Sequence, residues 1–306
     1  MTVAVLGSIN MDVIAYLPRL PKPGETLHGP EYRLGLGGKG ANQAVAARKL
    51  GSDVHLIGRV GADDFAGPAL RELAGHGVGL DLVLRDEGGA TGIAIINVGE
   101  GGENTISLIG GSNLRVDAGD VARGAAALDR ARVLLLQLEV PLAASLAATT
   151  RMRARGGIAV LDPAPAPAGG LAPEVLSAID IVTPNEGEAG SLLGWLPSTL
   201  AEGLEAARQL RARGAAAAIV KLGAKGLAFA TAHEEGTMAA FRVAAIDTVA
   251  AGDAFNGGLA NALERGLVFA EALRLASACG ALSTTRKGAS AAAPTLAEVE
   301  AFLATA

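Results

Sequence analysis

A regular alternation of apolar, strand-like runs with helix-like segments fills the chain from residue 117 onward. Strands are expected at residues 133–137, 158–161, 179–183 and 216–222. Helices are expected at residues 117–130, 141–155 and 200–213. Because neighbouring parallel strands need long crossover connections, usually helices, this order predicts a parallel sheet covered by helices on both faces.

The N-terminal part adds two further core strands, at residues 2–9 and 54–60, and a helix at 64–76. Between them, residues 13–34 form a proline-rich stretch of short alternating pieces, and 91–98 and 104–109 flank a glycine-rich loop as in a β-hairpin. We expect a single α/β domain over residues 1–306, a parallel-sheet αβα sandwich. A small β-sheet lid would be built from about 13–34 and 91–109.

Composition and charge limit the classes of partner. Half of the residues are hydrophobic and 19% are charged, which excludes a disordered chain. A net charge of −5 without a basic run argues against nucleic acid and anionic membranes as partners. The single cysteine, Cys279, cannot form an internal disulfide, the N-terminus lacks the basic flank of a signal peptide, and no apolar run reaches membrane-spanning length. We therefore expect a soluble, cytoplasmic protein.

Polar or glycine-rich groups recur where the expected strands end. They are Asn10 with Asp12, the 37–43 loop, Glu139, Asn185 with Glu188, the 222–226 loop and the 247–253 turn. Because the carboxyl ends of parallel strands meet at one edge of a sheet, these groups are expected to converge on one cleft.

The stretch Ala244–Ala262 carries the strongest catalytic signal. It is expected to run from a short apolar strand through the turn Ala250-Ala251-Gly252 into a helix with Asp253 in its first turn. Backbone N–H groups at such a helix start attract anions, and a carboxylate beside them is a candidate general base. The alternative is an ordinary helix-capping aspartate.

A second glycine-rich segment, residues 35–40, precedes an alanine-rich helix and carries Lys39 and Asn42 nearby. It matches the dinucleotide fingerprint G-x-G-x-x-G, with Asp53 further on, but it follows the proline-rich segment and not the first core strand. An NAD-dependent dehydrogenase is therefore a remote alternative. A helix start suited to hydroxyl-rich or phosphate ligands remains, beside the alternative of a plain turn.

Two acidic positions have competing interpretations. Asn185 and Glu188 either form a capping box or organise Mg²⁺ waters beside phosphates. Glu139 ends an apolar strand, where a carboxylate is costly unless it has a partner. The four histidines are dispersed without ligand spacing, so a zinc site is not expected.

Taken in order, the motifs closely resemble the ribokinase-like carbohydrate kinases, also called the phosphofructokinase-B family. The resemblance spans nearly the whole chain and rests on Gly7–Asp12, Pro23–Thr26, Gly37–Ala44, Gln137–Glu139, Asp162–Ala166, Thr183–Glu186, Asp247–Gly257 and Thr285–Ala289. The block Gly-Gly-Lys-Gly-Ala-Asn-Gln points to the members that phosphorylate ribose.

This resemblance implies a ribokinase-like fold with the lid over the sugar. It implies ATP-dependent phosphorylation of D-ribose at O5, giving D-ribose 5-phosphate and ADP, with Mg²⁺ and an activating K⁺. It also implies a homodimer formed through the lid. Alternatives are a sister kinase for 2-deoxyribose, another sugar or a nucleoside, with Asp12 and Asn42 deciding, and a non-catalytic sugar sensor.

The resemblance also assigns roles to residues. Those that would hold the sugar hydroxyls are Asn10, Asp12, Gly38, Lys39, Asn42 and Glu139. Asp253 would be the base, and Ala250, Ala251 and Gly252 would form the anion hole. Those that would contact the nucleotide are Asn185, Lys221, Gly223, Lys225, Gly226 and Gly252. Glu188 would act on Mg²⁺ through water. K⁺ would be held, mainly by backbone oxygens, at Asp247, Val249, Ser283, Arg286 and Gly288, whereas a family serine ligand is replaced by Ala292.

Overall fold

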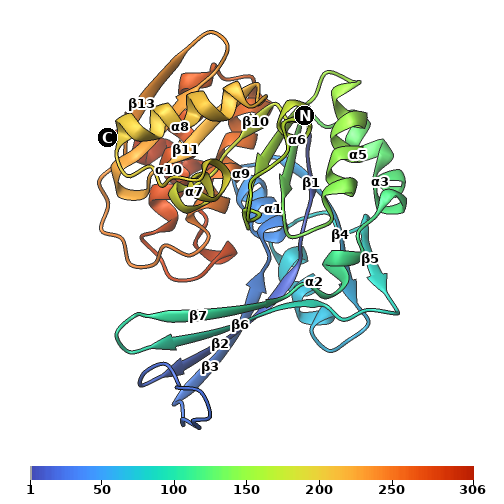
Figure 1. The fold of residues 1–306 in the computed structure, drawn as a ribbon. Coiled ribbons are helices and arrows are strands. Elements are labelled where there is room, and N and C mark those ends of the chain that lie inside the picture. Colours follow the sequence, from blue (N-terminus) through green and yellow to red (C-terminus); the bar gives the residue numbers. More distant parts are fainter. Residues whose placement is uncertain (1) are drawn as a thin grey trace.

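The computed structural model describes residues 2–306, which are organised around a nine-stranded sheet in the order β13-β12-β11-β10-β9-β8-β1-β4-β5 (Figure 1). The strands are β1 (Thr2–Leu6), β4 (Asp53–Gly61), β5 (Val83–Asp86), β8 (Val133–Gln137), β9 (Ile158–Asp162), β10 (Ile181–Val182), β11 (Ala217–Lys221), β12 (Gly226–Ala230) and β13 (Glu235–Ala239). From β5 to β11 every neighbouring pair is parallel. The predicted parallel sheet is therefore confirmed, and the antiparallel edge formed by β12 and β13 is an addition to it.

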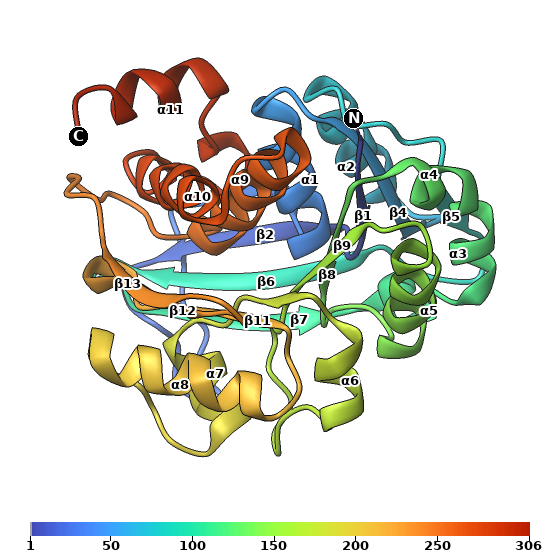
Figure 2. The same ribbon diagram turned by 90° about the horizontal axis from the view of Figure 1, so that it is seen from above.

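Helices cover both faces of this sheet, as Figure 2 shows from above. One layer holds α1 (Lys39–Lys49), α2 (Ala66–Gly75), α9 (Ala251–Arg265), α10 (Phe269–Ser283) and α11 (Leu296–Leu303). The other holds α3 (Ala118–Arg123), α4 (Ala125–Arg130), α5 (Leu142–Arg153), α6 (Pro173–Ala178), α7 (Glu186–Leu193) and α8 (Leu200–Ala212). Alternate residues of β1 serve the two layers: Val3 and Val5 belong to the first core, and Ala4 and Leu6 to the second. The αβα sandwich is confirmed.

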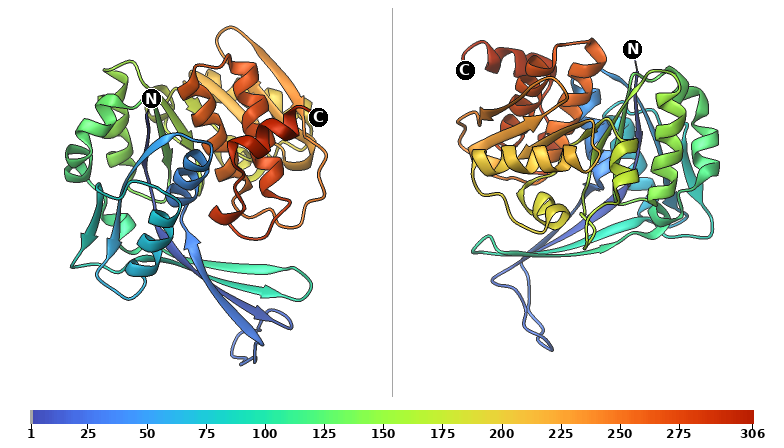
Figure 3. Two further views of the ribbon diagram at one scale, coloured as in Figure 1. Left: turned by 180° about the vertical axis from the view of Figure 1, so that it is seen from behind. Right: turned by 45° about the horizontal axis from the view of Figure 1, so that its top comes forward.

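A separate four-stranded sheet, called here the small sheet, has the order β3-β2-β6-β7. Its strands are β2 (Asn10–Leu17), β3 (Glu31–Gly37), β6 (Gly92–Gly99) and β7 (Asn104–Ile109). Figure 3 shows it projecting away from the helical layers in two further views. The predicted hairpin is the antiparallel pair β6–β7. The small sheet begins at Asn10 and not at residue 13, and residues 18–30 form a loop between β2 and β3.

Two sequence-based expectations are wrong in detail. The single helix at 117–130 is two helices, α3 and α4, which meet at Gly124. The strand before residue 247 is absent from the described chain, since the backbone N–H groups of Ile246 and Asp247 donate to the Thr284 carbonyl at the end of α10 instead. The dinucleotide match does join a strand, β3, to the helix α1, but β3 belongs to the small sheet and not to the core sheet, as the sequence indicated.

The switch in strand order places a crevice at β1. The chain runs outward from β1 through β4 to β5, and then returns to β8 on the other side of β1 and continues through β9, β10 and β11. Ligands of open α/β sheets bind at the carboxyl ends of strands at such a point. Asn10 follows β1 and Glu139 follows β8, so both lie at this switch.

Candidate active site

A cavity of about 1040 Å³ lies at the carboxyl edge of β9, β10 and β11, against the starts of α7 and α9. Its lining includes most of the residues that the resemblance assigns to the nucleotide and the anion hole: Asn185, Glu188, Lys221, Gly223, Lys225, Gly226, Ala250, Ala251, Gly252 and Asp253. Lys39 also lines it, whereas Asn10, Asp12, Asn42 and Glu139 lie outside its lining. The structure thus brings four of the six predicted strand ends to one cavity.

The start of α9 has an unusual backbone. Ala250, the residue before the helix, has φ 57° and ψ 15° and is the one non-glycine residue within residues 2–306 that adopts a positive φ. This conformation costs an alanine about 1 kcal/mol or more. It leaves the backbone N–H groups of Gly252 and Asp253 without a hydrogen-bond acceptor among the described residues. Two unpaired N–H groups at a helix N-terminus form an anion-binding site.

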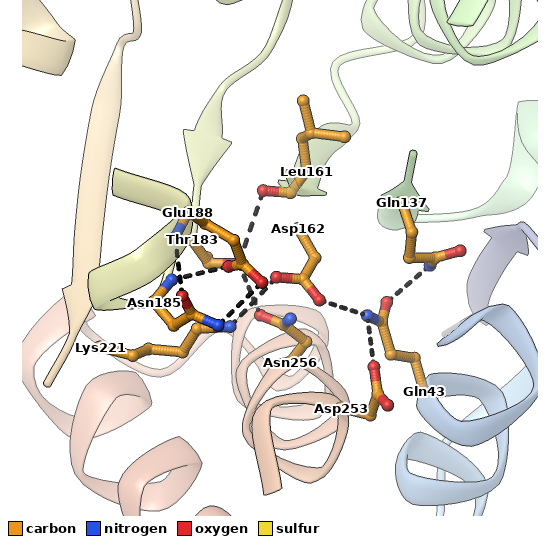
Figure 4. Close-up of polar contacts among 10 residues, drawn as sticks. All are labelled: Gln43, Gln137, Leu161, Asp162, Thr183, Asn185, Glu188, Lys221, Asp253 and Asn256. Carbon is orange, nitrogen blue, oxygen red and sulfur yellow. Dashed lines mark hydrogen bonds and ion pairs between the residues drawn. The ribbon is translucent and has the colours of Figure 1, made fainter. Parts of the chain in front are cut away.

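Asp253 is buried, with 5% of its surface exposed, and its carboxylate faces α1. Its Oδ1 accepts a hydrogen bond of 3.0 Å from Gln43 Nε2, and its Oδ2 accepts one of 3.2 Å from Asn42 Nδ2. Figure 4 shows the contact with Gln43. Since the carboxylate bonds to another helix and not to its own first turn, the simple helix-capping interpretation is wrong.

The electrostatics of Asp253 suit a base. Burial raises its pKa to about 6, the neighbouring Lys39 opposes this, and Asp162 adds to it. A carboxyl group with a pKa near 6 is ionised at neutral pH and is a stronger base than an exposed aspartate.

Asn42 and Asn10, two of the residues that the resemblance assigns to the sugar, have different hydrogen-bond partners. Asn42 is 7% exposed, and its Oδ1 is buried without a hydrogen-bond partner among the described residues. A buried acceptor of this kind costs free energy until a ligand hydroxyl donates to it. Asn10 Oδ1 instead accepts a 2.7 Å hydrogen bond from Asn113 Nδ2, and Asn113 also bonds both backbone groups of Ile9. Asn113 was missed from the sequence because it lies in a short 3₁₀ turn, 111–115, far along the chain.

Asp12 lies on β2 with its carboxylate against Gly37, where a Cβ would meet Asp12 Oδ1 at 1.9 Å. The pKa of Asp12 is raised to about 7, mainly by burial and then by the charges of Glu139, Glu72 and Asp253. No described residue donates a hydrogen bond to this carboxylate. The group is therefore placed to gain from a donor that a ligand brings.

Glu139 has the partners that its position requires. Its Oε2 accepts a 3.1 Å hydrogen bond from the backbone N–H of Lys39, the first residue of α1, and another from Ser8 Oγ. The helix N-terminus thus stabilises a carboxylate that would otherwise be costly at a strand end. Burial alone would lower the pKa of the Lys39 ammonium, but Asp253, Asp162, Glu139 and Glu188 together raise it above its ordinary value.

On the nucleotide side, Asn185 and Glu188 form the predicted capping box. Asn185 Oδ1 accepts from the Glu188 N–H at 2.9 Å, and Glu188 Oε2 accepts from the Asn185 N–H at 2.7 Å. Glu188 still lines the cavity, and burial and the charge of Asp162 raise its pKa. No group of three or more metal-binding side chains occurs within residues 2–306.

Two further lysines, beside Lys39, line the cavity. Lys221 Nζ is 3.1 Å from Asp162 Oδ1, and Lys225 pairs with Glu186 across the rim. The sequence analysis did not assign Asp162 to the site. Its position at the end of a core strand, comparable to that of Glu139 just after β8, was the signal that could have found it.

The segments assigned to K⁺ meet in space. Asp247 Oδ2 accepts a 3.1 Å hydrogen bond from the Gly288 N–H, and Asp247 Oδ1 accepts one of 3.0 Å from the Val249 N–H. The Arg286 side chain is paired with Glu298, and its N–H donates to the Ser283 carbonyl. The loops 247–249 and 283–288 are therefore held together.

The profile of the pfkB family of carbohydrate kinases matches residues 1–296. The chain belongs to this family. A ribokinase from Haemophilus influenzae is 39% identical over 302 residues, which cover 99% of this chain and 98% of that protein. A deoxyribokinase from Salmonella typhi is 36% identical over 303 residues, 99% of each chain.

Solved structures agree with this membership. A ribokinase from Thermotoga maritima has a TM-score of 0.89 and 33% identity and covers 100% of both chains. An Arabidopsis thaliana ribokinase complexed with ribose and ATP has a TM-score of 0.90 and 30% identity, over 100% of this chain and 99% of that one. The dehydrogenase alternative is excluded by this family and fold. No helix within the described residues is long and apolar enough to cross a bilayer.

Proposed function

We propose that this protein is an ATP-dependent kinase that phosphorylates D-ribose at O5, giving D-ribose 5-phosphate and ADP. The observation that carries the proposal is the start of α9, where the buried carboxylate of Asp253 lies beside two unpaired backbone N–H groups. This arrangement serves an alcohol acceptor and a migrating phosphoryl group together. Whole-length relatives named as ribokinases support the choice of sugar.

In the proposed reaction, Asp253 Oδ2 takes the proton of the sugar O5 hydroxyl. O5 forms a bond to the γ-phosphorus of ATP as the bond between that phosphorus and the β,γ-bridging oxygen breaks, and ADP leaves. The N–H groups of Gly252 and Asp253 stabilise the charge on the phosphoryl oxygens, with Ala250 and Ala251 shaping the turn. Positioning of two substrates in line contributes roughly 7–11 kcal/mol to such a reaction.

The sugar hydroxyls are assigned to Asn10, Asp12, Gly38, Lys39, Asn42 and Glu139. Two observations support this assignment: Asn42 Oδ1 has no hydrogen-bond donor among the described residues, and neither has the carboxylate of Asp12. Both groups would accept hydrogen bonds from sugar hydroxyls. A sister activity on 2-deoxyribose is the second candidate, because a deoxyribokinase is similar over the full length. A site that hydrogen-bonds the 2-hydroxyl rejects the deoxy sugar strongly, by about 10⁴-fold where its polar groups are left unpaired.

The nucleotide is assigned to the cavity, with Asn185, Lys221, Gly223, Lys225, Gly226 and Gly252 as its contacts. Magnesium bound with ATP neutralises phosphate charge, and Glu188 would hold one of its waters. K⁺ would lie between the loops of Asp247, Val249, Ser283, Arg286 and Gly288, where it would fix the turn that leads to α9. A cytoplasmic location stays a prediction.

A homodimer through the small sheet is part of the proposal. Six large apolar side chains of this sheet are exposed: Tyr32, Leu34, Ile95, Ile106, Leu108 and Ile109. Apolar side chains gathered on one sheet are typical of surfaces that a second subunit covers. The same sheet would close over the sugar as a lid and exclude water from the phosphoryl group.

A coupled assay of ADP release tests the function. D-Ribose and 2-deoxyribose are compared as acceptors with Mg²⁺ and ATP, with and without K⁺. We expect turnover on ribose, a much lower kcat/KM on 2-deoxyribose, and stimulation by K⁺. Equal or better turnover on 2-deoxyribose would favour the sister kinase, and binding of ribose without any ADP release would favour a non-catalytic sensor.

A further inference from the structure

Gln43 is a buried side chain at the centre of the site that neither the function nor the resemblance has given a role. It follows Asn42 on α1 and is fully buried. Its Nε2 donates to two carboxylates, Asp253 Oδ1 at 3.0 Å and Asp162 Oδ2 at 3.2 Å. Figure 4 shows the amide between these two groups.

The orientation of this amide is fixed by its neighbours. Only the nitrogen of Gln43 can face two carboxylates, because its oxygen would be repelled by both. The oxygen then needs a donor, and Gln137 Nε2 supplies it at 2.7 Å. Gln137 is itself fully buried and comes from the end of β8. The chain of donors therefore runs in one direction only, from Gln137 through Gln43 to the carboxylates.

The two carboxylates serve different halves of the site. Asp253 Oδ2 also accepts from Asn42, on the sugar side. Asp162 Oδ1 accepts from Lys221, which lines the nucleotide cavity and whose Nζ lies 3.3 Å from where a Cβ of Gly252 would be. The Gln43 amide thus connects Asp253, the proposed base, with the ion pair between Asp162 and Lys221 at the nucleotide cavity.

We propose that Gln43 is a positioning residue that holds Asp253 and Asp162 at a fixed separation and so couples the base to the nucleotide side of the site. The inference rests on the proposed role of Asp253 as the base. By occupying Oδ1, the amide turns Oδ2 toward the acceptor. Its amide nitrogen donates one hydrogen bond to each carboxylate and so lies between two like charges.

The charged groups that face Asp253 come from several elements. Lys39 on α1 stabilises its anion, whereas Asp162 at the end of β9, Glu139 after β8 and Asp12 on β2 oppose it. Loss of the Gln43 N–H leaves these charges in place and removes a hydrogen bond to the charged form. The pKa of Asp253 then rises, and the acid limb of the kcat profile moves to higher pH.

The test is Gln43→Met, which keeps the length of the side chain and removes both polar atoms. We expect the acid limb to move up by about one pH unit, the scale of a hydrogen bond to a charged group, and this shift alone to lower kcat at pH 7 by about twofold. The ribose dissociation constant, measured by calorimetry, should change far less. Recovery of kcat toward pH 9 would mark a shifted titration and not a damaged fold.

Thr183→Val is the matched control. Thr183 is fully buried, and its Oγ1 donates a 2.9 Å hydrogen bond to Asn256 on α9, the helix of Asp253, without touching either carboxylate. We expect a similar loss of melting temperature in both variants but no movement of the acid limb in Thr183→Val. If Gln43→Met does not fold, Gln43→Glu keeps the size and adds a third carboxyl group, which should move the acid limb up at least as far.

The inference would be overturned if the acid limb of Gln43→Met lay at the same pH as in the unmodified enzyme. If only Gln43→Glu folds, the same criterion applies to that variant. So would an equal shift in Thr183→Val. Failure of the proposed base gives a different result, because Asp253→Asn would then retain turnover. If Asp253→Asn is inactive while the acid limb of the Gln43 variant does not move, the coupling role of Gln43 is rejected and Asp253 remains the proposed base.

Discussion

Replacement of Asp12 by asparagine should make the empty protein more stable while weakening its hold on the sugar. The carboxylate of Asp12 is removed from water, lies among other acidic groups and has no hydrogen-bond donor among residues 2–306. An asparagine of the same shape carries no charge, so it avoids this penalty. Stability and binding are expected to trade against each other at this position.

The size of the effect follows from the pKa. The pKa of Asp12 is raised from 3.8 to about 7 in the folded protein, mainly by burial. The folded state therefore binds more protons than the unfolded state in this interval, and the free energy of unfolding falls as pH rises from about 4 to about 7. Three pKa units correspond to roughly 4 kcal/mol. This is an upper limit, because Asp12 keeps part of its hydration, and about 1–3 kcal/mol is expected at pH 8.

Thermal unfolding at pH 5 and pH 8, without sugar, measures the effect. Asp12→Asn should melt a few degrees higher than the unmodified protein at pH 8, at about 2 °C for each kcal/mol in a chain of this size. The difference between the two proteins should be clearly smaller at pH 5 than at pH 8. The exposed Asp81→Asn is the charge-matched control and should change neither value. Parallel melting curves for Asp12→Asn and the unmodified protein at both pH values would refute the reasoning.

Three further changes test the remaining parts of the site. Asp253→Asn should lower kcat by about 10²–10⁴-fold while ribose still binds by calorimetry, and near-normal turnover would contradict a general base at this position. Ala250→Val should destabilise the protein by roughly 1–3 kcal/mol in urea unfolding, because a branched side chain resists the positive φ, whereas Ala250→Gly should cost far less. Ile106→Glu, on an exposed strand of the small sheet, should give a monomer in sedimentation if that sheet forms the dimer. A variant dimer of unchanged affinity would reject this interface.

Local patterns in the sequence were sufficient to predict the start of the helix that carries Asp253. The small-residue turn, the acidic residue and the apolar spacing behind it all lie within a few positions, and the structure begins α9 at Ala251. The polar ends of the strands were equally readable, because parallel order alone brings them to one edge. These features depend on neighbours in the chain and on topology.

Contacts between distant segments could not be read in this way. Gln43 and Asp162 are 119 positions apart, and nothing in either local pattern shows that they touch. Asn113 and Asn10 are likewise separated by 103 positions. Residues 244–246 form no strand, because the backbone N–H groups of Ile246 and Asp247 donate to the Thr284 carbonyl at the end of α10. Tertiary packing decided each of these outcomes.

The raised pKa values of Asp12 and Asp253 connect the empty protein to its proposed substrate. Both carboxylates are held where burial and neighbouring acids penalise their charge, so the empty site stores unfavourable free energy. A sugar offers hydroxyl donors to these oxygens and stabilises their charged forms. Sugar binding should therefore lower both pKa values and release protons near neutral pH, and by linkage the affinity for ribose should rise between pH 6 and pH 8. The carboxylates that destabilise the empty fold are then the ones that recognise an uncharged polyol.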